Sequence, residues 1–120
     1  MNDPIFQKAH ELGRLIGQTP EYQALSRARA HVGEDRELVA RLNRLGELEF
    51  DVARALQEGR APDVAIEEEY ERLVSEVQAS PAYQALVAGQ ANLDRILQKV
   101  NDEIAHGMEA GAKSRIILTS

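Results

Sequence analysis

Apolar residues recur at helical spacing along nearly the whole chain, and no stretch shows the strict alternation typical of a β-strand. In the first segment they lie three or four positions apart, at Ile5, Ala9, Leu12 and Ile16. Proline, glycine and capping residues interrupt the pattern between segments. The sequence therefore predicts an all-α fold, a bundle of about five helices over roughly residues 4–16, 20–32, 36–58, 64–78 and 81–106.

One stretch occurs twice and defines the organisation of the chain. The segment from Thr19 to Leu25 returns as the segment from Ser80 to Leu86, an offset of 61 residues (80 minus 19). A hydroxyl residue suits the N-cap of a helix, and proline suits its first turn. Apolar positions upstream of both copies align as well. We therefore expect two related helical hairpins joined by a long central helix.

Other residues suggest where helices begin, end and cross. Asp3 and Asp35 are candidate N-caps, Gly17 a candidate left-handed terminator, and Gly59 closes the central helix. Three further glycines fall inside predicted helices, where each costs about 1 kcal/mol relative to alanine. Close helix crossings would explain them: Gly13, Gly46 and Gly89.

The helical pattern is lost after His106. Residues 1–106 are therefore expected to form a single helical domain, and residues 107–120, with two glycines, a mobile C-terminal tail.

Composition excludes several classes of function. The chain has no cysteine, so it holds no disulfide, no thiolate metal site and no cysteine nucleophile. The net charge is −6, and residues 61–120 contain 10 acidic and 5 basic side chains, which disfavours general nucleic-acid binding. No apolar run exceeds four residues, and no secretory signal is visible. We expect a cytoplasmic, soluble protein.

Candidate catalytic chemistry is sparse. No two of His10, His31 and His106 have the three- or four-residue spacing common in helical metal sites. We therefore expect no catalytic residue, no metal and no cofactor. Two acidic features leave a metal site or a functional acid open as alternatives. The run Glu67–Glu69 is either a solvated helix start or a metal-binding cluster, and Glu49 is either an arginine partner or a functional acid within an apolar stripe.

A basic stretch stands out in this acidic chain. It is either a solvated face, with Glu37 paired to Arg41 one turn away, or a site that docks an acidic partner or RNA. Charge reversal of Arg41 and Arg44 would then abolish the interaction and leave folding intact. The candidate docking residues are Arg27, Arg29, Arg36, Arg41 and Arg44.

The central helix has an unusually wide apolar stripe, spanning about 200° at 100° per residue, where one packed face needs somewhat over 100°. A second copy of the chain is the simplest cover, and the alternative is that the first and fourth helices wrap both sides. We expect a homodimer or higher homo-oligomer, with Leu48 and Phe50 at the stripe's edge. The candidate interface residues are Leu38, Val39, Leu42, Leu45, Leu48, Phe50 and Val52.

Over residues 4–106 the chain resembles the YlbF/YmcA family of small helical bacterial proteins. The resemblance lies in the segment from Gln18 to Tyr22, the break at Gly33–Asp35, the long charged-and-leucine helix, the segment from Ser80 to Leu86 and the terminal heptad helix. It implies an oligomeric cytoplasmic adaptor. Some members act in a complex that affects RNA processing by RNase Y, with consequences for competence, sporulation and biofilm formation. Some such complexes carry iron–sulfur clusters through cysteines, which this chain lacks.

Three functions follow as hypotheses. The first is a non-enzymatic regulatory or scaffolding protein that works through helix–helix contacts with itself, with related helical proteins or with an RNA-processing enzyme. The second is a small nucleic-acid-binding module that uses the segment from Arg27 to Arg44. The third is an enzyme with an acidic site at Glu49 or Glu67–Glu69.

Overall fold

The computed structural model describes residues 3–119, and the side chains of residues 3–114. Five α-helices make up this part of the chain, and it contains no strand. They are α1 (Pro4–Gly17), α2 (Pro20–Glu34), α3 (Arg36–Gln57), α4 (Val64–Gln78) and α5 (Pro81–Thr119). The expected all-α architecture, with a long helix between two related units, is confirmed. None of the described helices is both long and apolar enough to cross a membrane.

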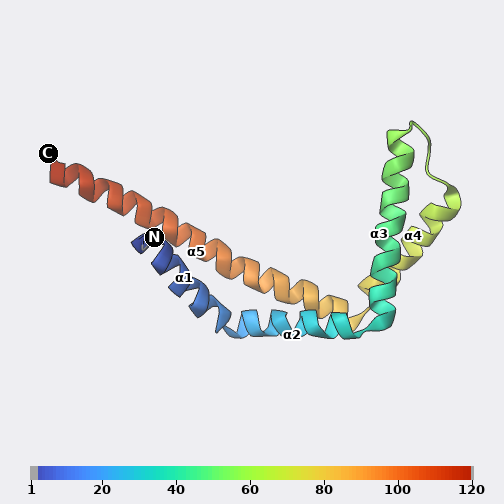
Figure 1. Cartoon of the computed structure of the whole chain (residues 1–120), viewed down its shortest axis with the longest axis horizontal. Helices are drawn as coiled ribbons and strands as arrows, with labels where there is room; N and C mark the ends of the chain where they lie inside the picture. Colours follow the sequence, from blue (N-terminus) through green and yellow to red (C-terminus); the bar gives the residue numbers. More distant parts are fainter. Residues whose placement is uncertain (1–2, 120) are drawn as a thin grey trace.

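The helices form two arms that meet at a bend (Figure 1). The long arm contains α1, α2 and α5, and the short arm is the hairpin of α3 and α4. The molecule measures 70 × 37 × 27 Å, with a Cα radius of gyration of 22.0 Å. A compact domain of this length would have a radius of about 14 Å. The chain is therefore elongated, and much of its helical surface has no neighbour within the chain.

The two repeated corners share two kinds of side-chain hydrogen bond. Thr19 Oγ1 accepts a hydrogen bond from the Tyr22 N–H at 3.1 Å, and Ser80 Oγ accepts one from the Tyr83 N–H at 3.3 Å. The corners also share a contact that was not anticipated. Gln23 Nε2 donates to the Gly17 carbonyl at 2.8 Å, and its equivalent in the second repeat, Gln84, donates to the Gln78 carbonyl at 2.9 Å. In each corner a hydroxyl side chain therefore caps the start of the second helix, and a glutamine side chain binds a carbonyl at the end of the first.

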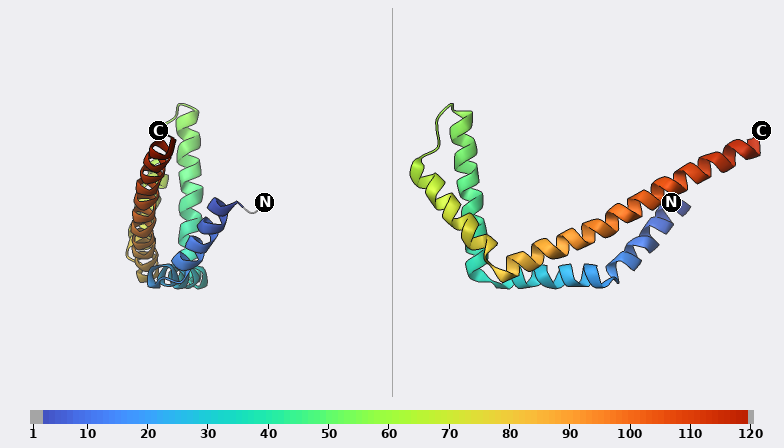
Figure 2. Two further views of the ribbon diagram at one scale, coloured as in Figure 1. Left: turned by 90° about the vertical axis from the view of Figure 1, so that its left-hand side faces the viewer. Right: turned by 180° about the vertical axis from the view of Figure 1, so that it is seen from behind.

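The helices do not pack mainly as the two expected hairpins, α1 with α2 and α4 with α5. The helices that flank each corner diverge, and the antiparallel pairs are α2 with α5 and α3 with α4 (Figures 1 and 2). Arg29 Nη2 donates to Gln90 Oε1 at 3.3 Å, and these two positions are equivalent under the 61-residue repeat. Because equivalent residues of related helices meet, α2 and α5 lie about an approximate two-fold axis. The repeats therefore pack on each other rather than each on itself.

Most of the core lies in the short arm and at the bend. Five residues form its buried cluster, which Tyr83 also contacts: Leu38, Leu45, Leu48, Leu73 and Val77. Leu25, Ala28 and Leu93 are buried on α2 and α5. No described residue of α1 is buried.

The glycines separate into different roles. A Cβ on Gly89 would lie 3.3 Å from the Leu25 Cα, so the predicted close crossing of α2 and α5 is confirmed there. At Gly13 and Gly46 a Cβ would meet nothing within 4 Å, so the close crossings expected for them are wrong. Gly59 ends α3 with a φ of 73°. The left-handed role expected for Gly17 is wrong, because Gly59 has the only positive φ in the described chain.

The last helix is longer than its pattern indicated. Instead of ending near His106, α5 continues to Thr119, because Gly107 and Gly111 weaken a helix without breaking it and no proline follows them. All described side chains of residues 101–114 are exposed. The mobility expected for residues 107–120 stays a prediction.

The Ser80 cap offers a direct test of the corner. Ser80→Ala removes the acceptor for the Tyr83 N–H and should lower the free energy of unfolding by about 1 kcal/mol, measured by urea denaturation at fixed protein concentration. Ser75→Ala, on the exposed side of α4, serves as the control. An equal loss in both variants would remove the special role of the cap.

Candidate functional site

The apolar stripe of α3 is mostly covered by the chain itself. Leu38, Leu45 and Leu48 are buried in the core cluster, so these three expected interface residues already have partners within the chain. Leu48, at one edge of the stripe, is 0% exposed, so the chain itself covers that edge. Val39, Leu42 and Val52 are half-buried, and Phe50 remains 66% exposed.

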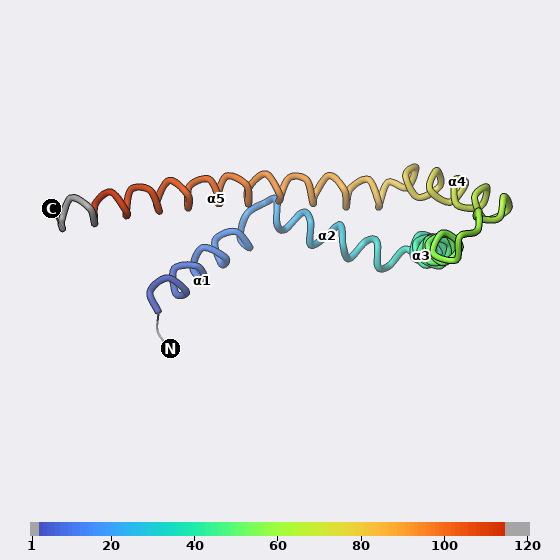
Figure 3. Tube along the Cα trace, turned by 90° about the horizontal axis from the view of Figure 1, so that it is seen from above, coloured from blue at the N-terminus to red at the C-terminus, as the bar shows by residue number. Residues whose placement is uncertain are grey.

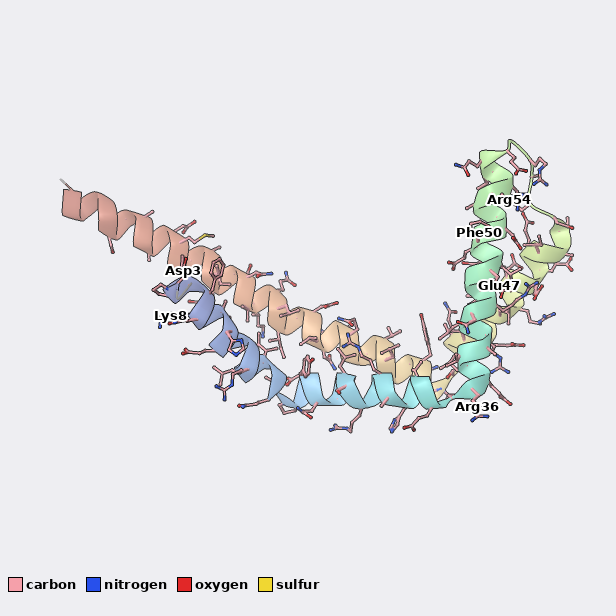
Figure 4. All side chains as sticks on the ribbon, viewed as in Figure 1. Asp3, Lys8, Arg36, Glu47, Phe50 and Arg54 are labelled. Carbon is pink, nitrogen blue, oxygen red and sulfur yellow. The ribbon has the colours of Figure 1, made fainter. Side chains whose placement is uncertain are left out.

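The cover for this stripe comes from several elements. Ile66, Tyr70 and Val74 of α4 pack against the core cluster, as do Val32 at the end of α2 and Ala82 at the start of α5. Of the two helices proposed to wrap α3, the fourth does so and the first does not, because α1 lies in the other arm (Figure 4). The width of the stripe is thus largely explained without a second copy.

The basic stretch separates into paired and unpaired arginines. The Arg44 guanidinium makes a bidentate contact with Glu69, at 2.7 and 3.0 Å, and a further bond of 2.9 Å with Glu47. Arg41 pairs with Glu76 at 3.1 Å, and not with Glu37 as expected. Both arginines therefore tie α3 to α4. Reversing their charges would also break these ion pairs, and the expectation that folding stays intact stays a prediction.

The remaining arginines are better placed to meet a partner. Arg29 is exposed and bonds only to Gln90 among the described side chains. Arg27 and Arg36 are exposed, and no carboxylate of the described residues lies within 4.0 Å of either. Arg36 lies at the base of α3, beside the bend (Figure 4). The basic stretch thus reduces to three arginines on α2 and at the start of α3.

The Arg44–Glu69 contact predicts a pH-dependent contribution to stability. Hydrogen bonds donated by Arg44 hold the pKa of Glu69 below its ordinary value, while partial burial opposes this. The hydrogen bonds that Arg44 donates to Glu69 and Glu47 raise its own pKa. Because the folded-state pKa of Glu69 is depressed, the stabilisation is complete above the unfolded-state value and is lost as pH falls through the folded-state value.

Glu69→Gln should therefore lower the denaturation midpoint at pH 7, and the difference from the natural chain should shrink below about pH 4. Glu68→Gln, one position along the same helix and exposed, is the matched control. A difference that persists unchanged at low pH would contradict this assignment.

Glu49 and the acidic run do not form a metal centre. Glu49 is exposed on α3, and the arginine partner expected for it is absent among the described residues. Glu69 binds Arg44, and Glu67 instead lines a hollow with Glu49. No group of three or more His, Asp or Glu side chains in the described chain could hold a metal ion.

A hollow lies between α3 and α4. It has a volume of about 610 Å³ and is open to solvent. Its apolar lining comes from both helices and the loop between them, and its charged lining is entirely acidic. The lining residues are Glu49, Val52, Ala53, Leu56, Pro62, Glu67, Tyr70 and Glu71. We call this feature the α3/α4 groove.

Two helices of the long arm present apolar side chains to solvent. On α1, Ile5 is 72% exposed and Phe6 is 70% exposed, and Leu15 is also exposed. On the distal part of α5, residues 97–114, the exposed large apolar side chains are Leu97, Ile104 and Met108. Seen from above, α1 swings away from α5, so the two helices do not cover each other (Figure 3). Soluble monomers rarely leave such surfaces uncovered.

The chain is similar to known proteins over most of its length. The family model described as "Control of competence regulator ComK, YlbF/YmcA" matches residues 5–109. The chain belongs to the YlbF/YmcA family. A UPF0342 protein of Streptococcus mutans is 30% identical over 108 residues, covering 84% of this chain and 96% of that protein. A UPF0342 protein of Leuconostoc mesenteroides is 24% identical over 98 residues, covering 82% and 84%.

The YlbF/YmcA family is a regulatory family associated with control of the competence regulator ComK. The resemblance inferred from the repeated corners and the long helices is thereby confirmed. What the residue patterns missed is the α3/α4 groove and the uncovered face of α1. The sequence alignment of α1 with α4 could have revealed the uncovered face of α1, because two helices with the same apolar pattern should each pack on another surface.

Proposed function

We propose that this protein is a non-enzymatic regulatory or scaffolding protein that acts through helix–helix contacts. The observation that supports this most is the uncovered apolar surface on α1 and on the distal part of α5 in an elongated chain. Enzyme sites are usually concave and gather a few polar groups around a pocket. The α3/α4 groove does gather three carboxylates, but its lining includes no histidine, arginine or lysine to act with them. The family is also regulatory.

The proposed partners are a second copy of the chain, related helical regulatory proteins, and an RNA-processing enzyme of the kind implied by the family resemblance. The test uses purified components. The chain is mixed with each YlbF/YmcA relative of its own host and with RNase Y, and the masses are measured by light scattering. A defined complex with at least one of these proteins is expected. Failure of every mixture to form one would contradict the adaptor role.

A second candidate function, RNA binding, rests on Arg27, Arg29 and Arg36. If it holds, Arg27→Glu with Arg36→Glu should weaken binding to a single-stranded RNA and reduce its salt dependence, because affinity from phosphate contacts falls with added salt. Arg54→Glu, which alters a local pair with Glu58 on the far end of α3, is the control. RNA binding that neither change affects would exclude this surface.

A further inference from the structure

Helix α1 has the apolar pattern of a helix that packs against a neighbour, but within the chain this face is not buried. It is 14 residues long, begins with an Asp3 cap and a proline, and has no buried residue. Isolated helices of this length are marginal in water, since most helical stability in proteins comes from packing an apolar face. The contacts of α1 within the chain are mainly with α2 at the corner. A surface outside the chain would supply the missing packing.

The repeat indicates what kind of surface α1 fits. Under the 61-residue offset α1 corresponds to α4, whose apolar face packs against α3. Leu73 and Val77 of α4 are buried there, whereas the equivalent Leu12 and Ile16 of α1 are only half-buried at the corner. Because the two helices share their apolar spacing, α1 is suited to lie along a helix pair such as α3 and α4.

Charge favours the α3/α4 groove as that surface. The charged residues lining it, Glu49, Glu67 and Glu71, are all acidic. Among the charged residues of α1, Lys8 lies on the side of Leu12, four residues on, whereas Glu11 and Arg14 lie away from the apolar face. The distal part of α5 has the opposite balance, with three acidic and two basic side chains between residues 97 and 114. Of the two uncovered helices, α1 is therefore the one whose charge complements the groove.

Within one chain the two surfaces are at opposite ends. Figure 4 places Asp3 and Lys8 of α1 in the long arm, and Glu47, Phe50 and Arg54 along α3 in the short arm. We propose that α1 of one copy docks into the α3/α4 groove of a second copy, and that the exchange is reciprocal. Each copy supplies one helix and one groove, so the exchange closes a two-fold dimer. This inference rests on the proposed function, because it names the chain itself as one partner.

Cross-linking gives a direct test because the chain contains no cysteine. One batch carries Ala9→Cys on the apolar face of α1, and a second carries Ala53→Cys in the groove. Mixed and mildly oxidised, the two should form a disulfide-linked pair of about twice the 13.3 kDa chain mass. Arg14→Cys, on the opposite face of α1, is the control and should cross-link poorly with Ala53→Cys.

Equal cross-linking by Ala9→Cys and Arg14→Cys would overturn the proposal. So would a cross-link within a single chain carrying both Ala9→Cys and Ala53→Cys, because α1 would then reach its own groove.

An equilibrium measurement separates this surface from the other uncovered helix. Leu12→Glu should raise the dimer dissociation constant at least about 30-fold, as expected for a central apolar contact. Gln7→Glu adds the same charge to the opposite face of α1 and should change it little. A dimer that Leu12→Glu leaves intact and Ile104→Glu dissociates would place the interface on α5. A chain that is monomeric throughout but still binds a relative would overturn this inference and leave the proposed function standing.

Discussion

Replacing Leu48 with alanine is expected to lower the free energy of unfolding by about 2–5 kcal/mol, the range for a buried leucine. The Leu48 side chain is fully buried among Leu38, Leu45, Leu73 and Val77. Its truncation removes apolar contacts and leaves a cavity between α3 and α4. Urea denaturation followed by circular dichroism measures the change, at one protein concentration so that association does not contribute.

Phe50 provides the matched control two residues along the same helix. Its ring is 66% exposed, so Phe50→Ala should change the free energy of unfolding by less than about 0.5 kcal/mol. If both variants lost stability equally, the assignment of buried and exposed faces on α3 would be wrong. If Phe50→Ala instead weakened self-association, the exposed ring would join the interface.

Gly89→Leu is expected to cost about 1–3 kcal/mol, as overpacking of a close contact usually does. A Cβ at this position would lie 3.3 Å from the Leu25 Cα, and a backbone atom cannot move aside as a flexible side chain can. The gain in helix propensity, about 1 kcal/mol, opposes this loss and is smaller than the cost of separating two helices.

Gly46→Leu is the control for that substitution. A Cβ on Gly46 meets nothing within 4 Å, and this residue is exposed on α3. The change should be neutral or should stabilise by up to about 1 kcal/mol. Thermal denaturation of both variants gives the comparison, and a loss at Gly46 as large as at Gly89 would contradict the close crossing of α2 and α5.

The local features of this fold could be predicted from the sequence because they depend on a few neighbouring residues. A cap such as Thr19 or Ser80 needs only the next turn of helix, and the proline after it fixes the start. Asp35 likewise caps α3 through the Leu38 N–H at 3.1 Å. The family followed from the same repeated segments.

The pairing of helices could not be predicted in this way. Periodicity shows which face of α3 is apolar but not which helix covers it. Most of the face that a second copy was expected to cover is covered by α4, the end of α2 and the start of α5. For the same reason Gly46 and Gly89 were indistinguishable in sequence, although only Gly89 meets another backbone. The groove depends on the spacing of α3 and α4 along the short arm, which no local pattern specifies.

The central claim is that a single chain is elongated and leaves helix faces for partners to cover. Small-angle X-ray scattering, combined with light scattering over a dilution series, tests it most directly. Where the measured mass is 13.3 kDa, the radius of gyration should be near 22 Å. If the dimer persists on dilution, Leu12→Glu supplies the single chain. A radius near 14 Å, as for a compact bundle of this length, would contradict the account.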